Sequence, residues 1–256
     1  MKTVLITGCS SGFGLDTARY FLARGWNVIA TMRSVREDLL PAAPNLRLLA
    51  LDVTDADSIA AAIAVAGPID VLVNNAGIGM LASLEGTPMA TARDVFETNT
   101  LGTIAMTQAV LPHMRARKDG VIVNVTSAVT MRALPMLSVY TGSKAAVEAF
   151  TESLALELQP FNIRVGLVLP GRSPTTKFGS NAGPRMAAGN PDAYMPMLQG
   201  IFAGSRDLTE VTTGEKVAEA VWRAATDPAA PLKIAGGADA VTWAKESSDP
   251  RFVTPR

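Results

Sequence analysis

The stretch Val4-Leu5-Ile6-Thr7-Gly8-Cys9-Ser10-Ser11-Gly12-Phe13-Gly14 joins a short apolar run to a turn that holds three glycines. A helical pattern begins at residue 12 and ends before Gly25. In a strand–turn–helix unit, such glycines permit a tight turn, and the unpaired N–H groups of the first helical turn attract an anion such as a pyrophosphate. The spacing is G-x3-G-x-G rather than the commoner G-x-G-x-x-G, so a bare turn without a ligand stays an alternative.

Short runs of β-branched residues alternate with longer helical patterns along most of the chain. Strands that are apolar throughout, such as Val71-Leu72-Val73, indicate a parallel sheet covered on both faces. Their alternation with helices predicts right-handed crossovers and a single α/β domain over residues 1–256, a Rossmann-type doubly wound parallel sheet with helices on both faces. The predicted strands are 3–7, 27–32, 46–53, 71–74, 121–126, 164–169 and 232–235, and the predicted helices are 12–24, 55–66, 90–118 (interrupted near Asn99), 139–159 and 214–226.

Residues 172–213 interrupt this alternation. The segment is rich in Gly, Pro and Met, and only a weak helical pattern at 192–202 stands out. Long irregular segments in compact domains commonly carry function. We interpret this segment as an insertion that lies over the sheet and forms a substrate lid.

Composition and charge exclude several classes of protein. The 256 residues are 48% hydrophobic and 18% charged, which is typical of a globular chain. Lys plus Arg and Asp plus Glu number 23 each, and no basic stripe stands out, which argues against a nucleic-acid partner. Apolar runs stay far shorter than the roughly 20 residues of a membrane span, so no membrane partner is expected.

The chain has one cysteine, Cys9, and one histidine, His113. A single cysteine cannot form an intrachain disulfide, which favours a reducing, cytoplasmic location. We interpret Cys9 as a small filler of the glycine-rich turn rather than a nucleophile. Because a dedicated zinc site needs several such ligands, no metal is expected, and His113 is predicted to lie at the surface.

The catalytic candidates are Tyr140 and Lys144, which stand four residues apart in a predicted helix and therefore on one face of it. A nearby ammonium stabilises a phenolate and should lower the tyrosine pKa from about 10, as a general acid/base requires. Such pairs are common on protein surfaces, but Ser127 strengthens the case. It directly follows the predicted strand 121–126, and parallel α/β folds bind their ligands at the carboxyl ends of the strands. There its hydroxyl can bond a substrate oxygen on which charge develops.

The end of the second predicted strand, Thr31-Met32-Arg33, bears on which dinucleotide the turn would bind. NAD-selective sites carry an acid about 20 residues past the glycines, hydrogen-bonded to the ribose 2′-hydroxyl. Here Met32 occupies that region, and Arg33 can pair with a 2′-phosphate, with Arg36 as a second candidate. The sequence therefore favours NADP(H). NAD(H) is the alternative if Arg33 is only a solvated surface arginine.

These motifs occur together in one known family. The chain resembles the classical short-chain dehydrogenases/reductases over essentially its full length. The beginning of the chain, with Ala30-Thr31-Met32-Arg33, is similar to the branch of 17β-hydroxysteroid and retinol dehydrogenases. The matching residues are Thr7-Gly8-x3-Gly12-x-Gly14, Asp52-Val53, Asn74-Asn75-Ala76-Gly77, Asn99, Ser127, Tyr140-x3-Lys144 and Pro170-Gly171.

The resemblance implies a catalytic set and a cofactor site. Asn99, Ser127, Tyr140 and Lys144 would be catalytic, with Asn99 holding a water in a proton relay to Lys144. Asp52 and Val53 would contact the adenine, and residues 170–175 would cradle the nicotinamide, although Arg172-Ser173-Pro174-Thr175 departs from the usual family pattern there. The implied dinucleotide-binding residues are Gly8, Ser10, Ser11, Gly12, Phe13, Gly14, Arg33, Asp52, Val53, Asn74, Ala76, Gly77, Tyr140, Lys144, Pro170, Gly171, Ser173 and Thr175.

The implied function is an NADP(H)-dependent oxidoreductase that moves a hydride between nicotinamide and a carbonyl or secondary alcohol carbon. By family, the partners would be a small-molecule substrate and further copies of the chain, as a homodimer or homotetramer. Apolar residues near the site favour a fairly apolar ketone, although ordinary core packing explains many of them equally well. They are Met131, Leu134, Pro135, Met136, Leu137, Phe178, Met186, Tyr194, Met195, Met197, Leu198 and Phe202.

Three alternative functions stay open. The same fold can serve as a non-catalytic NADP-binding regulator, although intact Ser127, Tyr140 and Lys144 argue against it. A lyase or epimerase can use the same Tyr/Lys pair, but such relatives usually carry a larger C-terminal substrate domain than 256 residues allow. The third alternative is an NAD-dependent dehydrogenase of the same family.

Overall fold

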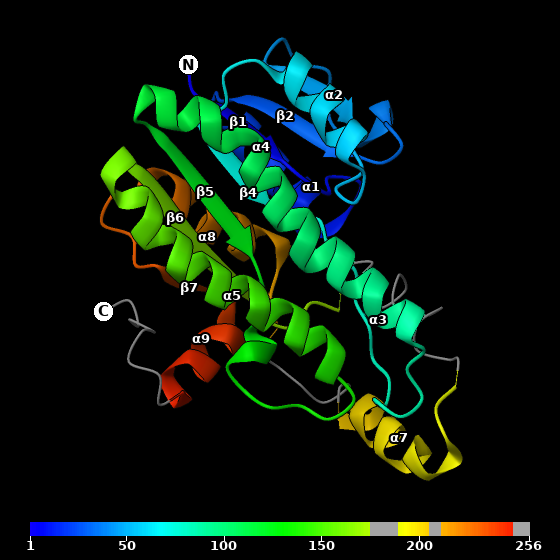
Figure 1. Ribbon diagram of the computed structural model, residues 1–256. Helices are drawn as coiled ribbons and strands as arrows, with labels where there is room; N and C mark the ends of the chain where they lie inside the picture. The colour runs from blue at the N-terminus through cyan, green and yellow to red at the C-terminus, as the bar shows by residue number, and fades with distance from the viewer. Residues whose placement is uncertain (175–188, 205–210, 248–256) are drawn as a thin grey trace.

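A seven-stranded parallel sheet forms the centre of the molecule (Figure 1). The computed structural model describes residues 1–174, 189–204 and 211–247. The strands are β1 (Thr3–Ile6), β2 (Asn27–Met32), β3 (Leu46–Ala50), β4 (Val71–Asn74), β5 (Gly120–Val125), β6 (Ile163–Pro170) and β7 (Lys233–Gly236). Their order in the sheet is β3-β2-β1-β4-β5-β6-β7, which confirms the predicted doubly wound α/β class.

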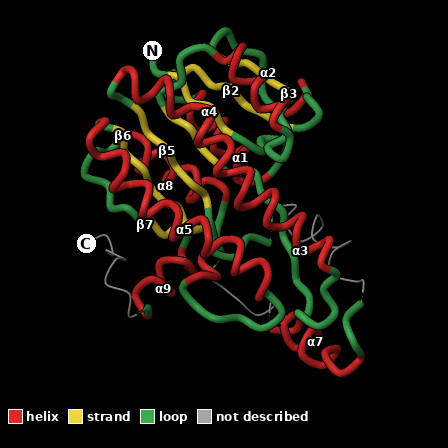
Figure 2. Tube along the Cα trace, viewed as in Figure 1, coloured by secondary structure: helices red, strands yellow, loops and turns green. Residues whose placement is uncertain are grey.

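Helices cover both faces of this sheet (Figure 2). They are α1 (Gly12–Leu22), α2 (Ala56–Ala66), α3 (Met89–Phe96), α4 (Gly102–Arg117), α5 (Ser138–Leu158), α7 (Met195–Gly204), α8 (Gly214–Thr226) and α9 (Ala238–Glu246), with a π-helical turn η2 (Glu97–Leu101) and 3-10 turns η1 (Glu37–Leu39), η3 (Ala128–Thr130), η4 (Gln159–Phe161) and η5 (Asp192–Tyr194). Within the residues that the structure describes, none of the helices combines the length and apolarity that a membrane crossing requires.

Two apolar cores lie on the two faces of the sheet. Val4 and Ile6 of β1 pack with α1 and α8, whereas Leu5 between them packs with α2, α4 and α5. Successive side chains of a strand point to opposite faces, so a strand covered on both sides needs an apolar residue at every position. All three side chains are fully buried, which explains why the strands are apolar throughout.

The order of the strands reverses between β1 and β4, and ligands of open α/β sheets bind beyond the carboxyl ends of the strands at such a point. The backbone N–H of Thr7 donates to the carbonyl of Val73 at 3.0 Å, which ties the ends of β1 and β4 together. The glycine-rich turn after β1 and the residues after β4 are therefore neighbours.

The C-terminal part of the chain differs most from the sequence-based expectation. The sequence does not predict α9, which is short and directly follows Gly236-Gly237; an acid in its first turn, Asp239, is the helix-start signal that could have revealed it. The weak pattern at 192–202 corresponds to η5 and α7. Figure 1 shows α7 and α9 beyond the end of the sheet where β5 and β6 finish. Residues 175–188 and 205–210 of the predicted lid lie outside the described residues.

Candidate functional site

The glycine-rich turn after β1 requires its glycines for two physical reasons. Gly8 and Gly12 have φ angles of +75° and +58°, a region that L side chains rarely adopt. A Cβ on Gly8 would lie 2.8 Å from the Ala76 Cα, and a Cβ on Gly14 would collide with the carbonyl group of Gly8. The turn is therefore compact, and its backbone can approach a bound phosphate closely.

Thr7 and Asn75 fix this turn to the segment after β4, a role that the sequence alone did not predict. The Thr7 hydroxyl accepts the N–H groups of Asn75 at 3.0 Å and Ala76 at 2.9 Å. The Asn75 side-chain amide donates to the Thr7 carbonyl at 2.9 Å. Both belong to the matched motifs, so their presence there was the available signal; the hydrogen bonds needed the tertiary structure.

The first turn of α1 is suited to an anion. Ser11 occupies the N-cap position without a side-chain capping bond, and no acidic residue lies in the first turn. Ser10 is exposed, and Ser11 and Phe13 are half-buried. Cys9 is fully buried, and burial raises the pKa of its thiol to about 12. The interpretation of Cys9 as a small filler is therefore confirmed.

Arg33 lies at the exposed end of β2, close to Asp52 after β3. The pKa of Asp52 is below its usual value, first because the N–H and the hydroxyl of Thr54 donate to its carboxylate at 3.0 and 2.8 Å. The Arg33 guanidinium adds a smaller electrostatic effect in the same direction. The exposed guanidinium of Arg33 and the carboxylate of Asp52 thus lie near each other, after the ends of β2 and β3.

Two further residues bear on the cofactor preference. Arg36 donates to the Asp38 carboxylate from Nε at 3.3 Å and from a terminal nitrogen at 2.7 Å, so it is engaged by its own neighbour rather than held toward a phosphate. The side chain of Met32 is 2% exposed and packs in the core beneath α1. An acid at residue 32 would therefore be buried among apolar groups instead of facing a ribose.

Ser127 and Tyr140 meet just past the carboxyl end of β5. Ser127 has an extended backbone and begins η3, where its hydroxyl accepts the Val129 N–H at 3.4 Å. The same hydroxyl is hydrogen-bonded to the Tyr140 phenol, which is 6% exposed in the first turn of α5. The structure therefore joins the two residues that the sequence placed 13 positions apart.

Burial raises the pKa of Tyr140 to about 12, and the hydrogen bond from Ser127 opposes this rise. The expectation that Lys144 lowers this pKa below its ordinary value is therefore wrong for the chain as it folds, because the desolvation of a phenolate outweighs the favourable contacts. At neutral pH the phenol is therefore protonated and has a proton to donate.

Lys144 is buried one helical turn beyond Tyr140 on α5, and its Nζ donates to the carbonyl of Val125 at 3.1 Å. Burial lowers the pKa of this ammonium to about 8, and the carboxylate of Glu148 opposes the decrease. Lys144 is therefore mainly charged at neutral pH. A Cβ on Gly77, after β4, would lie 3.4 Å from Nζ, so glycine leaves room beside the ammonium.

Asn99 is buried in η2, the π-helical turn that interrupts the long helical pattern where the sequence predicted a break. Its amide donates to the Ile78 carbonyl at 3.0 Å, and its carbonyl oxygen accepts the Ile78 N–H at 2.8 Å. The amide also donates to the Ser143 hydroxyl at 3.1 Å. Asn99 thus fixes the segment after β4 against α5, next to Lys144; π-helical turns are frequent at functional sites.

Asn74 lies at the centre of a buried polar chain across the sheet. Its amide donates to the Thr107 hydroxyl of α4 at 3.1 Å and to Asn124 of β5 at 2.9 Å. Asn124 in turn donates to the Thr151 hydroxyl of α5 at 2.8 Å. The side chains of Asn74 and Asn124 therefore connect β4 and β5 to each other and to α4 and α5.

The loop after β6 is held by Thr212 and Asp239, neither of which was predicted from the sequence. The Gly171 N–H donates to the Thr212 hydroxyl at 3.0 Å, and the Arg172 N–H donates to the Asp239 carboxylate at 2.6 Å. Thr212 also donates to Asp239 at 2.6 Å, and its N–H donates to the Arg172 carbonyl at 2.8 Å. Both stems of the predicted lid are therefore bound to each other and to α9.

The other predicted residues of this loop have mixed outcomes. Pro170 is buried at the end of β6, beside Gly236 of β7. Ser173 is half-buried, and Thr175 lies outside the described residues. The residues that would cradle a nicotinamide thus begin at a fixed strand end, and the structure describes only the first part of them.

The apolar residues predicted to line a substrate pocket differ in their burial. Leu198 of α7 packs with Leu81 and Met136, and Leu137, Tyr194 and Ile201 border this cluster. Met195, Met197 and Phe202 are exposed on α7. Phe178 and Met186 lie outside the described residues. Part of the set is therefore packed core, as the plainer interpretation expected.

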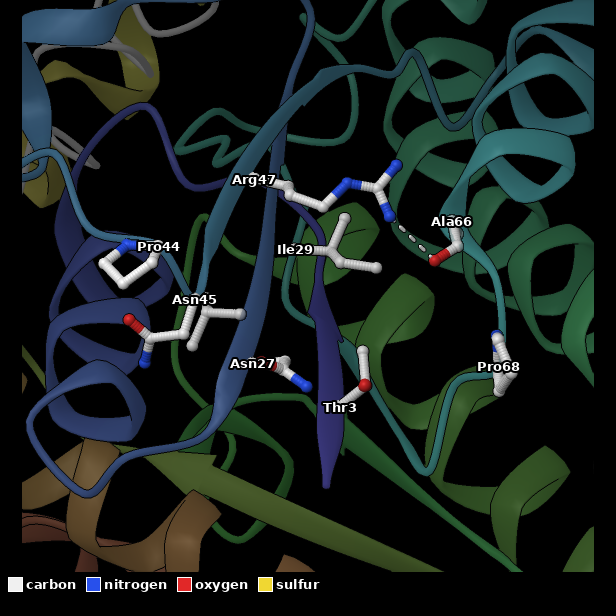
Figure 3. A pocket seen from close by; sticks show the side chains of 9 residues that line it. Thr3, Asn27, Ile29, Pro44, Asn45, Arg47, Ala66 and Pro68 are labelled. Carbon is white, nitrogen blue, oxygen red and sulfur yellow. Dashed lines mark hydrogen bonds between the residues drawn. The ribbon is translucent and has the colours of Figure 1, made fainter. Parts of the chain in front are cut away.

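A pocket at the opposite end of the sheet is lined by Thr3, Asn27, Val28, Ile29, Pro44, Asn45, Arg47, Ala66 and Pro68 (Figure 3). The Arg47 guanidinium donates to the carbonyls of Ala66 at 3.0 Å and Val65 at 2.5 Å, at the C-terminus of α2. The cation thus satisfies carbonyls that a helix end leaves unpaired. We interpret this pocket as part of the packing between the sheet and the end of α2, away from the candidate catalytic residues.

Comparisons with known proteins agree with this geometry. A model of the family described as short chain dehydrogenase matches residues 2–184. The chain is 41% identical over 181 residues to retinol dehydrogenase 8 of Homo sapiens, a match that covers 66% of this chain and 58% of that protein. It is 38% identical over 240 residues to the uncharacterized oxidoreductase YusZ of Bacillus subtilis (strain 168), over 88% of this chain and 85% of that protein. The first of these similarities confirms the resemblance to the retinol dehydrogenase-like branch.

Solved structures share the fold over most of the chain. A short-chain dehydrogenase from Streptomyces avermitilis superposes with a TM-score of 0.82 at 36% identity, over 94% of this chain and 90% of that one. The closed form of a serine dehydrogenase complexed with NADP+ superposes with a TM-score of 0.80 at 28% identity, over 93% and 95%.

Proposed function

Because the chain belongs to the short-chain dehydrogenase family, we propose that it is an oxidoreductase that interconverts a carbonyl and an alcohol with a nicotinamide dinucleotide. One observation carries the proposal. The Ser127 hydroxyl is hydrogen-bonded to the buried Tyr140 phenol at the carboxyl end of β5, one helical turn from the Lys144 ammonium. A non-catalytic binding protein has no need to bury such a set.

The residues around β1 and β4 fit such a dinucleotide. Gly8 and Gly14 keep the turn compact, and the start of α1 has no capping side chain and no acid in its first turn, which suits a pyrophosphate. Gly77 is exposed beside the Lys144 ammonium, where a ribose hydroxyl would find a donor. The dinucleotide supplies or accepts the hydride, and the protein orients and polarises the reacting groups.

The roles of the catalytic residues follow from their protonation states. In the reducing direction, the Tyr140 phenol gives its proton to the carbonyl oxygen of the substrate. The Ser127 hydroxyl donates a hydrogen bond to the same oxygen as charge develops there. The Lys144 ammonium favours the phenolate that remains, because an opposite charge nearby stabilises it. In the oxidising direction, Tyr140 receives the proton.

The remaining family contacts are part of the same proposal. Asn99 holds the relay water near Lys144; its place in a buried π-helical turn beside Gly77 supports this role. The loop that begins at Gly171 cradles the nicotinamide, which is supported by the backbone N–H groups that Thr212 and Asp239 hold in place. Asp52 and Val53 contact the adenine.

NADP(H) is the proposed form of the dinucleotide. Arg33 is exposed at the end of β2 and can pair with a 2′-phosphate, since guanidinium groups form strong bidentate bonds with phosphate. The serine dehydrogenase that shares the fold is complexed with NADP+. NAD(H) remains the alternative, because Asp52 lies within the electrostatic range of Arg33 and partly neutralises it.

The proposed substrate is a fairly apolar ketone or the matching secondary alcohol. Leu198 of α7 packs against Met136 and Leu81, on the segments that flank the catalytic residues. Met195 and Met197 are exposed on the same helix, and flexible methionines adapt to apolar ligands. The similarity to retinol dehydrogenase 8, by its name an enzyme for an apolar alcohol, supports the apolar character of the substrate.

We extend the proposal to the assembly and location of the protein. Leu101 and Leu156 are exposed on η2 and α5, as expected of helices that pack in a homodimer or homotetramer. The single cysteine suits a reducing cytoplasm. Light scattering of the purified chain measures the number of copies, and a monomer would contradict the assembly.

The test is an assay of dinucleotide consumption against a panel of carbonyl compounds graded in size and polarity. We expect NADPH to be oxidised with bulky apolar ketones faster than with small charged carbonyls, and faster than NADH with the same ketones. Binding of NADPH without turnover on any carbonyl or alcohol would favour the non-catalytic regulator. A preference for small charged carbonyls would contradict the substrate class alone.

A further inference from the structure

A buried carboxylate lies one helical turn beyond Lys144. Glu148 of α5 is 7% exposed, and its Oε2 pairs at 3.2 Å with Nζ of Lys233, the first residue of β7, which is 3% exposed. Lys233 also pairs with Glu152 of α5 at 2.9 Å, but the Glu152 side chain is 28% exposed. Burying charges is costly, and an ion pair does not repay that cost by itself. The burial of Glu148 therefore calls for a reason.

The second oxygen of Glu148 binds both sides of the Ser127 turn. The Thr130 hydroxyl donates to Oε1 at 2.5 Å, and the Thr126 hydroxyl donates to the same atom at 3.4 Å. Thr126 directly precedes Ser127, and Thr130 ends the 3-10 turn that Ser127 begins. One carboxylate thus holds the backbone on either side of the hydroxyl that contacts Tyr140.

Glu148 also acts on Lys144 through its charge. The two residues stand four apart on α5 and therefore on one face of the helix. Burial lowers the pKa of Lys144, and Glu148 is the carboxylate that raises it again. The groups around Glu148 are Lys144 and Glu152 of α5, Lys233 of β7 and the hydroxyls of Thr126 and Thr130. Those near Lys144 are Tyr140 and Glu148, each one helical turn away on α5, Asn99 of η2 and the Val125 carbonyl.

We propose that Glu148 is a positioning residue of the site: it keeps Lys144 in the ammonium form and holds the Ser127 turn against Tyr140, with Lys233 as its counter-ion. The proposal rests on the proposed function for its meaning in catalysis. The competing explanation is that the Glu148–Lys233 pair only joins α5 to β7. In that case the neutralisation of Glu148 would lower stability and leave the titration of Lys144 unchanged.

Glu148→Gln separates the two explanations, because glutamine keeps an oxygen for Thr130 and removes the charge. Protein labelled in its lysines is titrated by NMR, with the Lys144 signal assigned through Lys144→Arg. We expect the Lys144 midpoint to fall by roughly one pH unit from its value near 8, since a negative charge close to an ammonium favours its charged form. An unchanged or higher midpoint overturns the proposal.

Glu152→Gln is the matched control. It also deprives Lys233 of one carboxylate, but residue 152 lies two helical turns from Lys144 and has a more exposed side chain. We expect its Lys144 midpoint to stay within about 0.3 pH units of the parent chain, because exposed and distant charges are screened. Equal shifts in both variants would assign the effect to Lys233 and overturn the role of Glu148.

Two further measurements complete the test. If Glu148→Gln does not fold, Lys233→Met is compared with Lys233→Met/Glu148→Gln, where removal of both charges leaves no unpaired buried ion; the midpoint must be lower in the double variant. In turnover assays, the decline of activity at alkaline pH should move down by the same shift. Because the NMR titration needs no turnover, it reports on Glu148 even if the proposed function fails.

Discussion

The two ends of the central sheet differ in how deeply their ionisable side chains are buried. At the amino end, Arg47, Asn45 and Asp70 each hydrogen-bond to backbone groups of a neighbouring element, at 3.0, 2.7 and 2.7 Å. These side chains satisfy backbone groups at a helix end and at the starts of strands, and they remain partly in contact with water. At the carboxyl end, Tyr140 and Lys144 are buried. Burial raises the pKa of Tyr140 and lowers the pKa of Lys144, so it favours the neutral form of both groups.

This contrast indicates that the amino end of the sheet contributes mainly to stability, whereas the carboxyl end carries the candidate reactive groups. Hydrogen bonds at the amino end satisfy groups that would otherwise be unpaired, so they stabilise the fold. Burial of ionisable groups at the carboxyl end costs free energy, and proteins tolerate that cost mainly where such groups react. Substitutions at the carboxyl end should therefore change turnover more than stability, and substitutions at the amino end should do the reverse.

The largest effect is expected at Tyr140. Tyr140→Phe removes the proton donor and leaves the ring packed, so turnover should fall by about 100- to 10,000-fold, as general acid–base groups contribute. NADPH binding, measured by fluorescence, should persist. Tyr20→Phe, which removes a hydroxyl on α1 far in sequence from the site, is the control and should retain turnover. Near-normal turnover of Tyr140→Phe would contradict its assigned role.

A smaller effect is expected at Arg33, which bears on selectivity rather than on chemistry. Arg33→Ala should weaken the preference for NADPH over NADH by about 10- to 100-fold, because hydrogen bonds to a charged phosphate contribute about 1.5–3 kcal/mol. The ratio of kcat/KM for the two dinucleotides measures this preference. Arg36→Ala is the matched control, since Asp38 already engages that guanidinium. An equal change in both variants would refute the assignment to Arg33.

The smallest effect on turnover is expected at Arg47, on the amino side of the comparison. Arg47→Ala should lower the free energy of unfolding by about 1–2 kcal/mol, because two hydrogen bonds to the end of α2 are lost. Turnover at low temperature should be unchanged. Denaturant titration measures the loss, with Arg115→Ala on the exposed surface of α4 as the control. A marked loss of turnover in folded Arg47→Ala would contradict the claim that residues at the amino end of the sheet act on stability rather than on turnover.

The sequence alone determined the sheet, its flanking helices and the main candidates for the site. Apolar runs and the glycine-rich turn are local signals, since period and turn geometry depend on residues close together in the chain. The break near Asn99 was also local, and it corresponds to η2. Ser127 and Tyr140 were predicted to belong to one catalytic site, Ser127 because it follows the carboxyl end of a strand; their hydrogen bond to each other was seen only in the structure.

The tertiary structure decided what depends on burial and on distant partners. Lys233 reaches Glu148 across 85 residues, and Asp239 reaches Thr212 across 27; no local pattern encodes such pairs. The direction of the Tyr140 pKa also needed the fold, because burial raises it while the hydrogen bond with Ser127 lowers it. Which influence is larger depends on how much water the folded chain excludes, and that is a property of packing rather than of sequence spacing.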